Sequence, residues 1–252
     1  MAMHTLEGQR VLVVGGSRGL GLGIVEALLA QHADVTVVAR DRSRLAELSA
    51  RLNVSTIAGD ATDPTLAEAA LRQVRPSVLV VNAGAPPTMA PLHEHTWESF
   101  TEIWNADVKA AFHWVQAAIR LPLARGSRVL LSSSGAAIKG SPLSGGYAGA
   151  KRMIWMMADY ANGVASDLDL GIRFQAVVLR QLVGDTAVGG VAVQAYARRQ
   201  GVSPDSILAG SGRPLSPRDF GEHITTVLTS PEYESITAFG IRGLEGVESL
   251  DA

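Results

Sequence analysis

VGGSRGLG, residues 14–21, is the stretch on which the interpretation of this sequence rests. Five of its eight residues are Gly or Ser, and it directly follows the apolar run Val-Leu-Val-Val at 11–14. Glycine costs backbone entropy, so such a cluster beside a core strand indicates a sharp turn or a close approach of the backbone to a bulky group. A loop between a strand and a helix presents N–H groups and a helix dipole to a phosphate. A tight turn without a ligand has the same pattern, so the rest of the sequence must decide between the two.

The composition is that of an ordinary globular protein. The 252 residues are 47% hydrophobic and 18% charged, which favours one large domain, residues 1–252, over two small ones. A net charge of -2 gives no electrostatic reason to expect nucleic acid or an anionic membrane as a partner. The sequence has no Cys and no apolar stretch long enough to cross a bilayer. We therefore expect a cytoplasmic protein without disulfides or thiolate metal sites.

Short apolar runs alternate with stretches of helical periodicity, as in repeated βα units on a parallel sheet. The pattern predicts an α/β fold with a doubly wound sheet of seven parallel strands and helices on both faces. The strands are expected over 10–14, 34–39, 54–58, 77–82, 127–133, 172–178 and 236–241. The helices are expected over 20–31, 42–51, 64–73, 96–121, 147–167 and 217–229.

One region departs from this alternation. Residues 184–216 are punctuated by glycines and follow the carboxyl end of a predicted strand, with a short helix expected near 187–200. A long apolar insertion with glycine hinges is typical of a lid over a substrate pocket. A surface excursion without a role is the alternative.

The end of the second predicted strand bears on the choice of cofactor. Dinucleotide sites contact the adenosine ribose about 20 residues beyond the glycine loop, through an acid for NAD or a cation for the additional phosphate of NADP. Here the strand ends at Ala39 and Arg40, and Arg18 lies within the loop itself. Two arginines can hold a 2′-phosphate, so the sequence predicts NADP(H) over NAD(H). Asp41 keeps the alternative open, because a shift of one residue would let it accept from a ribose hydroxyl.

A second group of residues predicts the chemistry. Tyr147 and Lys151 are four residues apart and share a helix face, and Ser134 ends a neighbouring predicted strand. A free tyrosine titrates near 10, so donating a proton near neutral pH requires a stabilisation of the phenolate by roughly 3–4 kcal/mol. One ammonium about 4 Å away supplies about 4 kcal/mol at an effective dielectric of 20. The serine would hydrogen-bond a carbonyl oxygen, the tyrosine would protonate it, and a nicotinamide would supply the hydride.

Together these motifs resemble those of the short-chain dehydrogenase/reductase family over nearly the whole chain. Residues 60–61 and 81–84 are similar to two further elements of that family, although Val81 replaces an Asn. The resemblance implies a Rossmann-type fold, a catalytic Ser134-Tyr147-Lys151 set and a homodimer or homotetramer. The cofactor-binding residues that it implies are Gly15, Ser17, Arg18, Gly19, Leu20, Gly21, Arg40, Asp60, Ala61, Asn82, Ala83, Gly84, Tyr147, Lys151 and Leu182.

Two departures from the family pattern affect the site. The family often has a fourth catalytic residue, an Asn whose carbonyl holds a water; Asp107 falls at its position and Asn105 lies two residues earlier. A Pro-Gly turn beside the nicotinamide is replaced by Leu179-Arg180. Arg180 is interpreted either as a contact for an acidic substrate or as half of a structural ion pair.

We therefore predict an NADPH-dependent reductase of ketones or aldehydes, acting reversibly on a small molecule. The alternative is a protein that senses NADP(H) on the same fold without chemistry; a sugar epimerase or dehydratase is disfavoured because little chain remains for a second domain. The segments that shape the pocket, 85–95, 135–146 and 184–216, leave open cyclic ketones, keto esters, carrier-linked keto groups and steroids. His93 and His95 lack further ligands, so no metal is expected.

Overall fold

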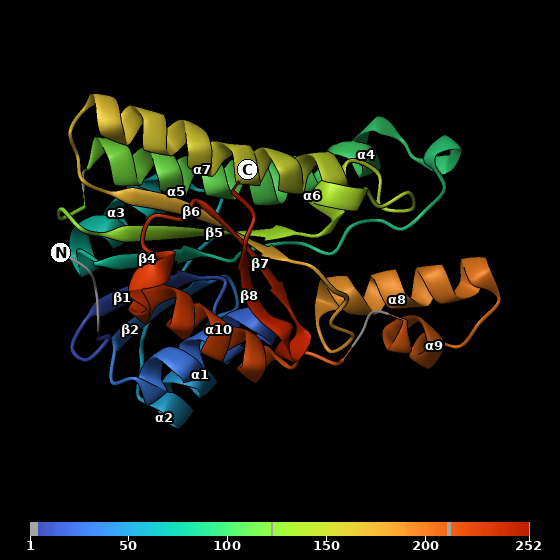
Figure 1. Cartoon of the computed structure of the whole chain (residues 1–252), viewed down its shortest axis with the longest axis horizontal. Coiled ribbons are helices and arrows are strands. Elements are labelled where there is room, and N and C mark those ends of the chain that lie inside the picture. Colours follow the sequence, from blue (N-terminus) through green and yellow to red (C-terminus); the bar gives the residue numbers. More distant parts are fainter. Residues whose placement is uncertain (1–4, 122, 211–212, 252) are drawn as a thin grey trace.

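The structure, a computed structural model, describes residues 5–121, 123–210 and 213–251. These residues form three layers, a central sheet with helices on both of its faces (Figure 1). The sheet has the order β3-β2-β1-β4-β5-β6-β7-β8, so the chain starts in the middle and winds outward in both directions. Its strands are β1 (Arg10–Val14), β2 (Asp34–Ala39), β3 (Ser55–Ala58), β4 (Val78–Val81), β5 (Arg128–Ser134), β6 (Arg173–Leu179), β7 (Ala238–Arg242) and β8 (Gly246–Ser249).

The doubly wound α/β fold is confirmed, with one correction to the strand count. The seven predicted strands are parallel, but the described residues contain an eighth strand, β8, which pairs antiparallel with β7. Gly246 has a φ of 93°, in the left-handed region, and lets the chain reverse directly after β7. The sequence did not predict this strand because Gly-Val-Glu-Ser is short and has little apolar alternation.

Each face of the sheet is covered by its own set of helices (Figure 1). On one face lie α1 (Gly19–Ala30), α2 (Arg42–Leu52) and α10 (Pro217–Thr229). On the other lie α3 (Pro64–Val74), α5 (Lys109–Arg120) and α7 (Tyr147–Asp167). The strands between them are apolar on both sides, as in β4, whose four residues are all buried. Parallel strands covered on both faces need such continuous apolar runs.

The predicted long helix over 96–121 is divided into three parts. The chain forms α4 (Trp97–Ile103), then a π-helical turn (Trp104–Val108), and then α5. The capping box of Thr96 and Ser99 starts α4. A π-helical turn changes the direction in which its side chains point, and such turns occur often at functional sites.

Three further helices lie toward the carboxyl ends of the strands. They are α6 (Ala136–Lys139), α8 (Ala187–Gln200) and α9 (Pro204–Ala209), and α8 and α9 project from the right of Figure 1. The helix expected near 187–200 is present as α8, whereas α6 and α9 were not predicted. Residues 211–212 of the 184–216 segment lie outside the described residues. Within the described ranges, no helix is both long and apolar enough to cross a membrane.

Candidate active site

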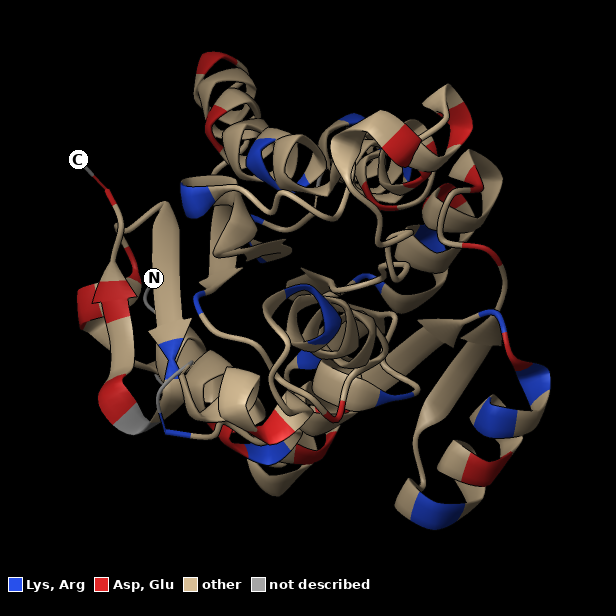
Figure 2. Cartoon of the chain, turned by 90° about the vertical axis from the view of Figure 1, so that its right-hand side faces the viewer, with Lys and Arg blue, Asp and Glu red and all other residues tan. Residues whose placement is uncertain are grey.

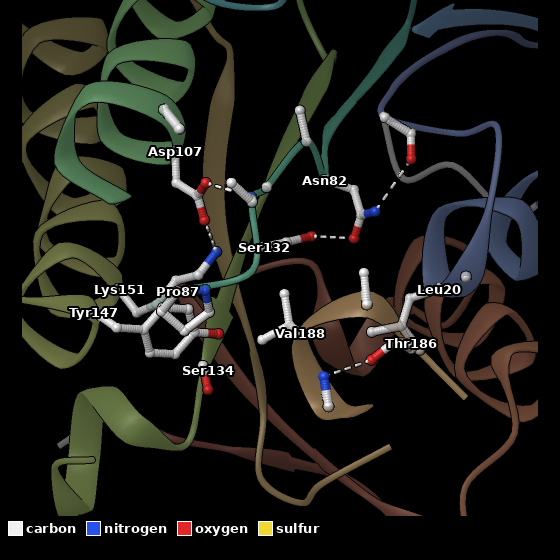
Figure 3. Close-up of a pocket in the computed structure, with 18 of the residues that line it drawn as sticks. Leu20, Asn82, Pro87, Asp107, Ser132, Ser134, Tyr147, Lys151, Thr186 and Val188 are labelled. Carbon is white, nitrogen blue, oxygen red and sulfur yellow. Dashed lines mark hydrogen bonds and ion pairs between the residues drawn. The ribbon is translucent and has the colours of Figure 1, made fainter. Parts of the chain in front are cut away.

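A cleft of about 1310 Å³ crosses the carboxyl ends of the central strands. Ligands of doubly wound sheets bind at this edge, where the strand order reverses. The close-up in Figure 3 shows side chains from α7 and β5 on one wall and Leu20 and Thr186 on the other. The predicted site residues that line the cleft are Gly15, Ser17, Arg18, Gly19, Leu20, Arg40, Asp60, Ala61, Asn82, Ala83, Gly84, Ser134, Tyr147, Lys151 and Leu182.

The glycine loop lies against the segment after β4. A Cβ on Gly15, whose φ is 85°, would lie 2.6 Å from Cα of Ala83, so no side chain fits there. Gly21 does not line the cleft; it lies behind the loop, where a Cβ would be 2.0 Å from the carbonyl oxygen of Gly15. Its role is to let α1 pack against the loop.

The first turn of α1 is suited to an anion. Arg18, its N-cap residue, makes no side-chain hydrogen bond to the helix, whereas Asp41 and Asp63 cap α2 and α3 through their carboxylates. The first N–H groups of α1 therefore have no side-chain acceptor, and the first turn of α1 has no acidic residue. The residues of this loop fit the phosphates of a dinucleotide.

At the adenosine end of the cleft, Asp41 is already engaged. Its carboxylate accepts from the backbone N–H of Arg44 at 3.1 Å and lies 3.3 Å from the guanidinium of the same residue. Arg18 and Arg40 have no ion-pair partner in the described part of the chain. Two guanidiniums without an ion-pair partner among the described residues thus line this end of the cleft, while the carboxylate of Asp41 caps α2.

Asp60 lies nearby as a fixed carboxylate. Hydrogen bonds from the backbone N–H and the hydroxyl of Thr62, with the charges of Arg40 and Lys109, hold the pKa of Asp60 below its usual value against the effect of burial. Asp60 is therefore ionised at neutral pH.

Asn82 connects the two halves of the sheet beneath the cleft. Its side-chain amide donates to the carbonyl oxygen of Gly15 at 3.4 Å, and its Oδ1 accepts from the hydroxyl of Ser132 at 3.0 Å (Figure 3). The sequence did not single out Ser132, because a serine within a run of three carries no signal of its own. This chain of hydrogen bonds holds the glycine loop in register with the end of β5.

Ser134, Tyr147 and Lys151 lie on the same wall of the cleft (Figure 3). Ser134 is the last residue of β5, Tyr147 is the first residue of α7, and Lys151 follows one turn later, with its Nζ 5.6 Å from the centroid of the phenol ring. The hydroxyl of Ser133 donates to the carbonyl oxygen of Lys151 at 2.8 Å and ties α7 to β5. Only 8% of Tyr147 and 7% of Lys151 is exposed, so both side chains lie in largely dehydrated surroundings.

Asp107 is the acidic partner of Lys151. Its Oδ2 lies 2.8 Å from Nζ of Lys151, and its Oδ1 accepts from the backbone N–H of Ala85 at 2.9 Å. Burial alone would lower the pKa of Lys151, but the charges of Asp107 and Tyr147 and the hydrogen bond to Asp107 raise it above its usual value. Asn105, the other residue considered for this position, is exposed and lines the outer cleft.

Arg180 forms a structural ion pair. Its guanidinium contacts the carboxylate of Glu248 on β8, and its backbone N–H donates to the carbonyl oxygen of Ile241 at 2.8 Å. This pairing joins the end of β6 to the last strand. Of the two interpretations of Arg180, the structure favours the ion pair.

His93 and His95, the two histidines considered as metal ligands, both contact other residues of the chain. The two ring nitrogens of His95 lie 3.0 Å from the hydroxyl of Ser99 and 3.1 Å from the carbonyl oxygen of Ala90. His93 lies beside Glu94 on the surface. No group of three or more potential metal ligands occurs among the described residues.

The part of the cleft beside α8 combines apolar side chains with one polar contact. The wall is formed by Pro87, Met89, Val188 and Ala192. The hydroxyl groups of Ser141 and Tyr196 lie 2.9 Å apart and join the segment before α7 to α8. Figure 2 looks onto this end of the molecule and shows charges of both signs scattered among uncharged segments, without a block of one sign.

The class of the protein follows from the fold, the cleft and a family comparison. The model of the family described as short chain dehydrogenase matches residues 9–179, which is more than half of the chain. The match begins just before β1 and ends with β6, and it includes Ser134, Tyr147 and Lys151. The protein belongs to the short-chain dehydrogenase family.

Several curated relatives are similar to part of the chain. L-xylulose reductase of Mesocricetus auratus is 35% identical over 123 residues, which are 48% of this chain and 50% of the relative. A tropinone reductase homolog of Arabidopsis thaliana is 35% identical over 146 residues, 53% of this chain and 54% of the relative. Carbonyl reductase (NADPH) 2 of Sus scrofa is 32% identical over 120 residues, 47% of this chain and 49% of the relative. The chain spans about half the length of the curated relatives that it matches.

Proposed function

We propose that the protein is an NADPH-dependent reductase that converts a ketone or aldehyde to an alcohol, reversibly. The observation that carries the proposal is the position of Ser134, Tyr147 and Lys151 on one wall of a cleft whose far end contains the glycine loop. The names of the relatives, which are reductases, support the same class of reaction.

Each of the three side chains has a role in this proposal. The cofactor supplies a hydride when bound. The Ser134 hydroxyl donates a hydrogen bond to the carbonyl oxygen, on which negative charge develops during reduction. The phenol of Tyr147 gives its proton to that oxygen, and the Lys151 ammonium stabilises the phenolate that results. In the direction of alcohol oxidation, the same groups act in reverse.

The choice of NADP(H) over NAD(H) rests on the adenosine end of the cleft. Arg18 and Arg40 are the residues proposed to hold the 2′-phosphate, because neither has an ion-pair partner among the described residues and Asp41 caps α2. A relative with NADPH in its name supports this choice. Arg40→Ala should raise the KM for NADPH about tenfold or more and leave the KM for NADH nearly unchanged. An equal effect on both cofactors would assign Arg40 to a structural role.

We propose that residues 1–252 form a single domain and that the 184–216 segment is a substrate lid. The contact of Tyr196 on α8 with Ser141 is the closed arrangement that we assign to this lid. The apolar wall beneath it suits a small uncharged carbonyl compound. Location in the cytoplasm stays a prediction from the sequence.

We also propose that the protein is a homodimer or homotetramer. Large apolar side chains are exposed on α5, on α7 and directly after α7, among them Phe112, Tyr160 and Leu168, with exposed fractions of 47%, 57% and 58%. A second copy would cover this surface. Analytical ultracentrifugation tests this assignment, and a monomer at micromolar concentration would contradict it.

The experiment that tests the function is a screen of ketones and aldehydes with NADPH and NADH, following the absorbance of the reduced nicotinamide. We expect turnover with NADPH, and Tyr147→Phe should reduce kcat by about 10³-fold or more while cofactor affinity changes little. Wild-type rates in this variant would refute the assignment of the proton donor. Tight binding of NADPH with no turnover across the screen would support the cofactor-sensing alternative instead.

A further inference from the structure

The carboxylate of Asp107 is held in place beside the ammonium of Lys151. The side chain of Asp107 is 1% exposed and that of Lys151 is 9% exposed. The backbone N–H of Ala85 fixes Oδ1, and Oδ2 has no hydrogen-bond partner in the described part of the chain other than the ammonium 2.8 Å away. The ammonium is therefore the charged group that compensates this buried carboxylate.

Two features of the backbone make room for this carboxylate. Asp107 lies in the π-helical turn at 104–108, which places it inside the protein while Asn105 stays at the surface. A Cβ on Gly84 would lie 3.0 Å from Oδ2 of Asp107, so the residue opposite the carboxylate has to be small. The backbone therefore leaves room at this position for a buried side chain of the size of Asp107.

Two opposite charges lie next to the phenol of Tyr147. Nζ of Lys151 is 5.6 Å from the ring centroid, and the carboxylate of Asp107 pairs with that ammonium. The apolar residues Ile103, Ala85 and Val188 belong to the same packed cluster as Tyr147. Other charged side chains that line the cleft include Glu98, Glu102 and Lys139. A lysine alone would place a full positive charge beside the phenol, but the ion pair reduces this charge.

Assuming the proposed reductase function, we infer that Asp107 is a positioning residue that holds Lys151 and offsets its charge, which extends carbonyl reduction to higher pH. Reduction needs the phenol of Tyr147 in its protonated form, because the phenol is the proton donor. A negative charge nearby opposes loss of that proton, whereas an unopposed ammonium favours it. Oxidation of the alcohol needs the deprotonated form and would therefore begin only at a more alkaline pH.

The test is the pH profile of Asp107→Asn, in both directions of the reaction. Asn keeps an oxygen for the backbone N–H of Ala85 but removes the charge. We expect the pH at which half of the reduction rate is lost, and the pH at which oxidation begins, to move down by about one unit. An unchanged profile, or a move to higher pH, would overturn the inference.

The matched control is Asp169→Asn, which makes the same chemical change and breaks the ion pair of Arg125 and Asp169 at the opposite edge of the sheet. Its pH profile should coincide with that of the wild type. If the wild type reduces no carbonyl compound, the proposed function fails. If it is active and Asp107→Asn leaves the profile unchanged, only the present inference fails.

A second measurement needs neither cofactor nor turnover. Tyrosinate absorbance is titrated in the wild type and in Asp107→Asn, and the signal of Tyr147 is obtained by subtracting the matching Tyr147→Phe variants. We expect this signal to develop at a pH about one unit lower when the carboxylate is absent. A purely structural role of Asp107 would leave the signal in place and would refute the inference.

Discussion

One cation is buried beside the amino ends of the strands, here called the amino edge of the sheet, and another beside their carboxyl ends, the carboxyl edge. The two cations differ in their partners. Arg128 at the amino edge donates to Oε1 of Gln175 at 2.7 Å and to the carbonyl oxygens of Val227 and Leu228 at 2.8 and 3.1 Å. Lys151 at the carboxyl edge is held by the carboxylate of Asp107, lies over the ring of Tyr147, and has no other ion-pair partner among the described residues. The first cation donates from Nε and Nη1 to the protein's own acceptors, although its Nη2 has no hydrogen-bond partner among the described residues. The second leaves donors directed at the cleft.

The amino edge thus uses its buried polar groups for stability. The guanidinium of Arg128 caps the last carbonyls of α10 and joins that helix to the sheet. Burial, together with the charge of Arg173, lowers the pKa of Arg128 to about 10, so it remains charged at neutral pH. The acceptors of Arg128 are neutral, an amide oxygen and two backbone carbonyls, and they hold the guanidinium without a carboxylate.

Replacing both partners at the carboxyl edge should have the largest effect on activity. In the double variant Lys151→Met and Asp107→Asn, we expect kcat to fall by about 10³-fold, because the phenolate loses its counter-ion. The free energy of unfolding should change by less than about 1 kcal/mol, because the desolvation of both charges disappears with their attraction. Steady-state kinetics and urea unfolding measure the two quantities. A large loss of stability with activity retained would show that the ion pair at the carboxyl edge serves stability and not activity, contrary to this comparison.

Arg128→Met at the amino edge should show the opposite pattern. We expect the free energy of unfolding to fall by about 3 kcal/mol, because Gln175 and two carbonyls at the end of α10 lose their donor. Turnover per folded molecule should match that of the wild type. Arg128→Lys serves as a control that keeps the charge without the forked geometry and should recover part of the loss.

A smaller effect is expected for Asn162, which also stabilises the amino edge. Its side chain donates to the carbonyl oxygen of Phe174 at 2.7 Å and accepts from the backbone N–H of the same residue at 2.9 Å. Asn162→Ala should lower the free energy of unfolding by about 1–2 kcal/mol. Asn162→Asp keeps only the acceptor, and a loss equal to that of Ala would show that the accepted hydrogen bond contributes little.

The smallest effect is expected at the exposed ion pair of Arg125 and Asp169. The hydrogen bond and charge of Arg125 hold the pKa of Asp169 below its usual value, so the pair exists above about pH 4 and is lost as the pH falls through the lowered pKa. Solvent screens both side chains, which are 66% and 88% exposed. Asp169→Asn should therefore leave Tm unchanged at neutral and at acid pH, as thermal unfolding would show.

Local patterns were enough to predict the seven parallel strands and α7, because each rests on a regular apolar period in its own segment. The short strand β8 and the π-helical turn at 104–108 were not predictable in this way. Strand β8 forms because it pairs with the edge strand β7. The π-helical turn lies within a stretch whose apolar period predicts a continuous helix. Both depend on contacts with parts of the chain that are distant in sequence.

In the candidate site, too, local patterns predicted some residues, whereas others depended on contacts between distant parts of the chain. Ser134, Tyr147 and Lys151 were predicted as site residues from their types and spacing, and the structure places all three on one wall of the cleft. The choice between Asp107 and Asn105, and between two roles for Arg180, needed the structure. Each depends on which partner comes within reach, Lys151 in one case and Glu248 in the other.

The sequence by itself determined that this is a short-chain dehydrogenase with a glycine loop and a Ser-Tyr-Lys set, because these features are local motifs on regular elements. Only the tertiary structure decided that the lysine shares its charge with a buried carboxylate. That ion pair joins residues 107 and 151, which lie on different helices, and no spacing along a chain reveals which buried charges will meet.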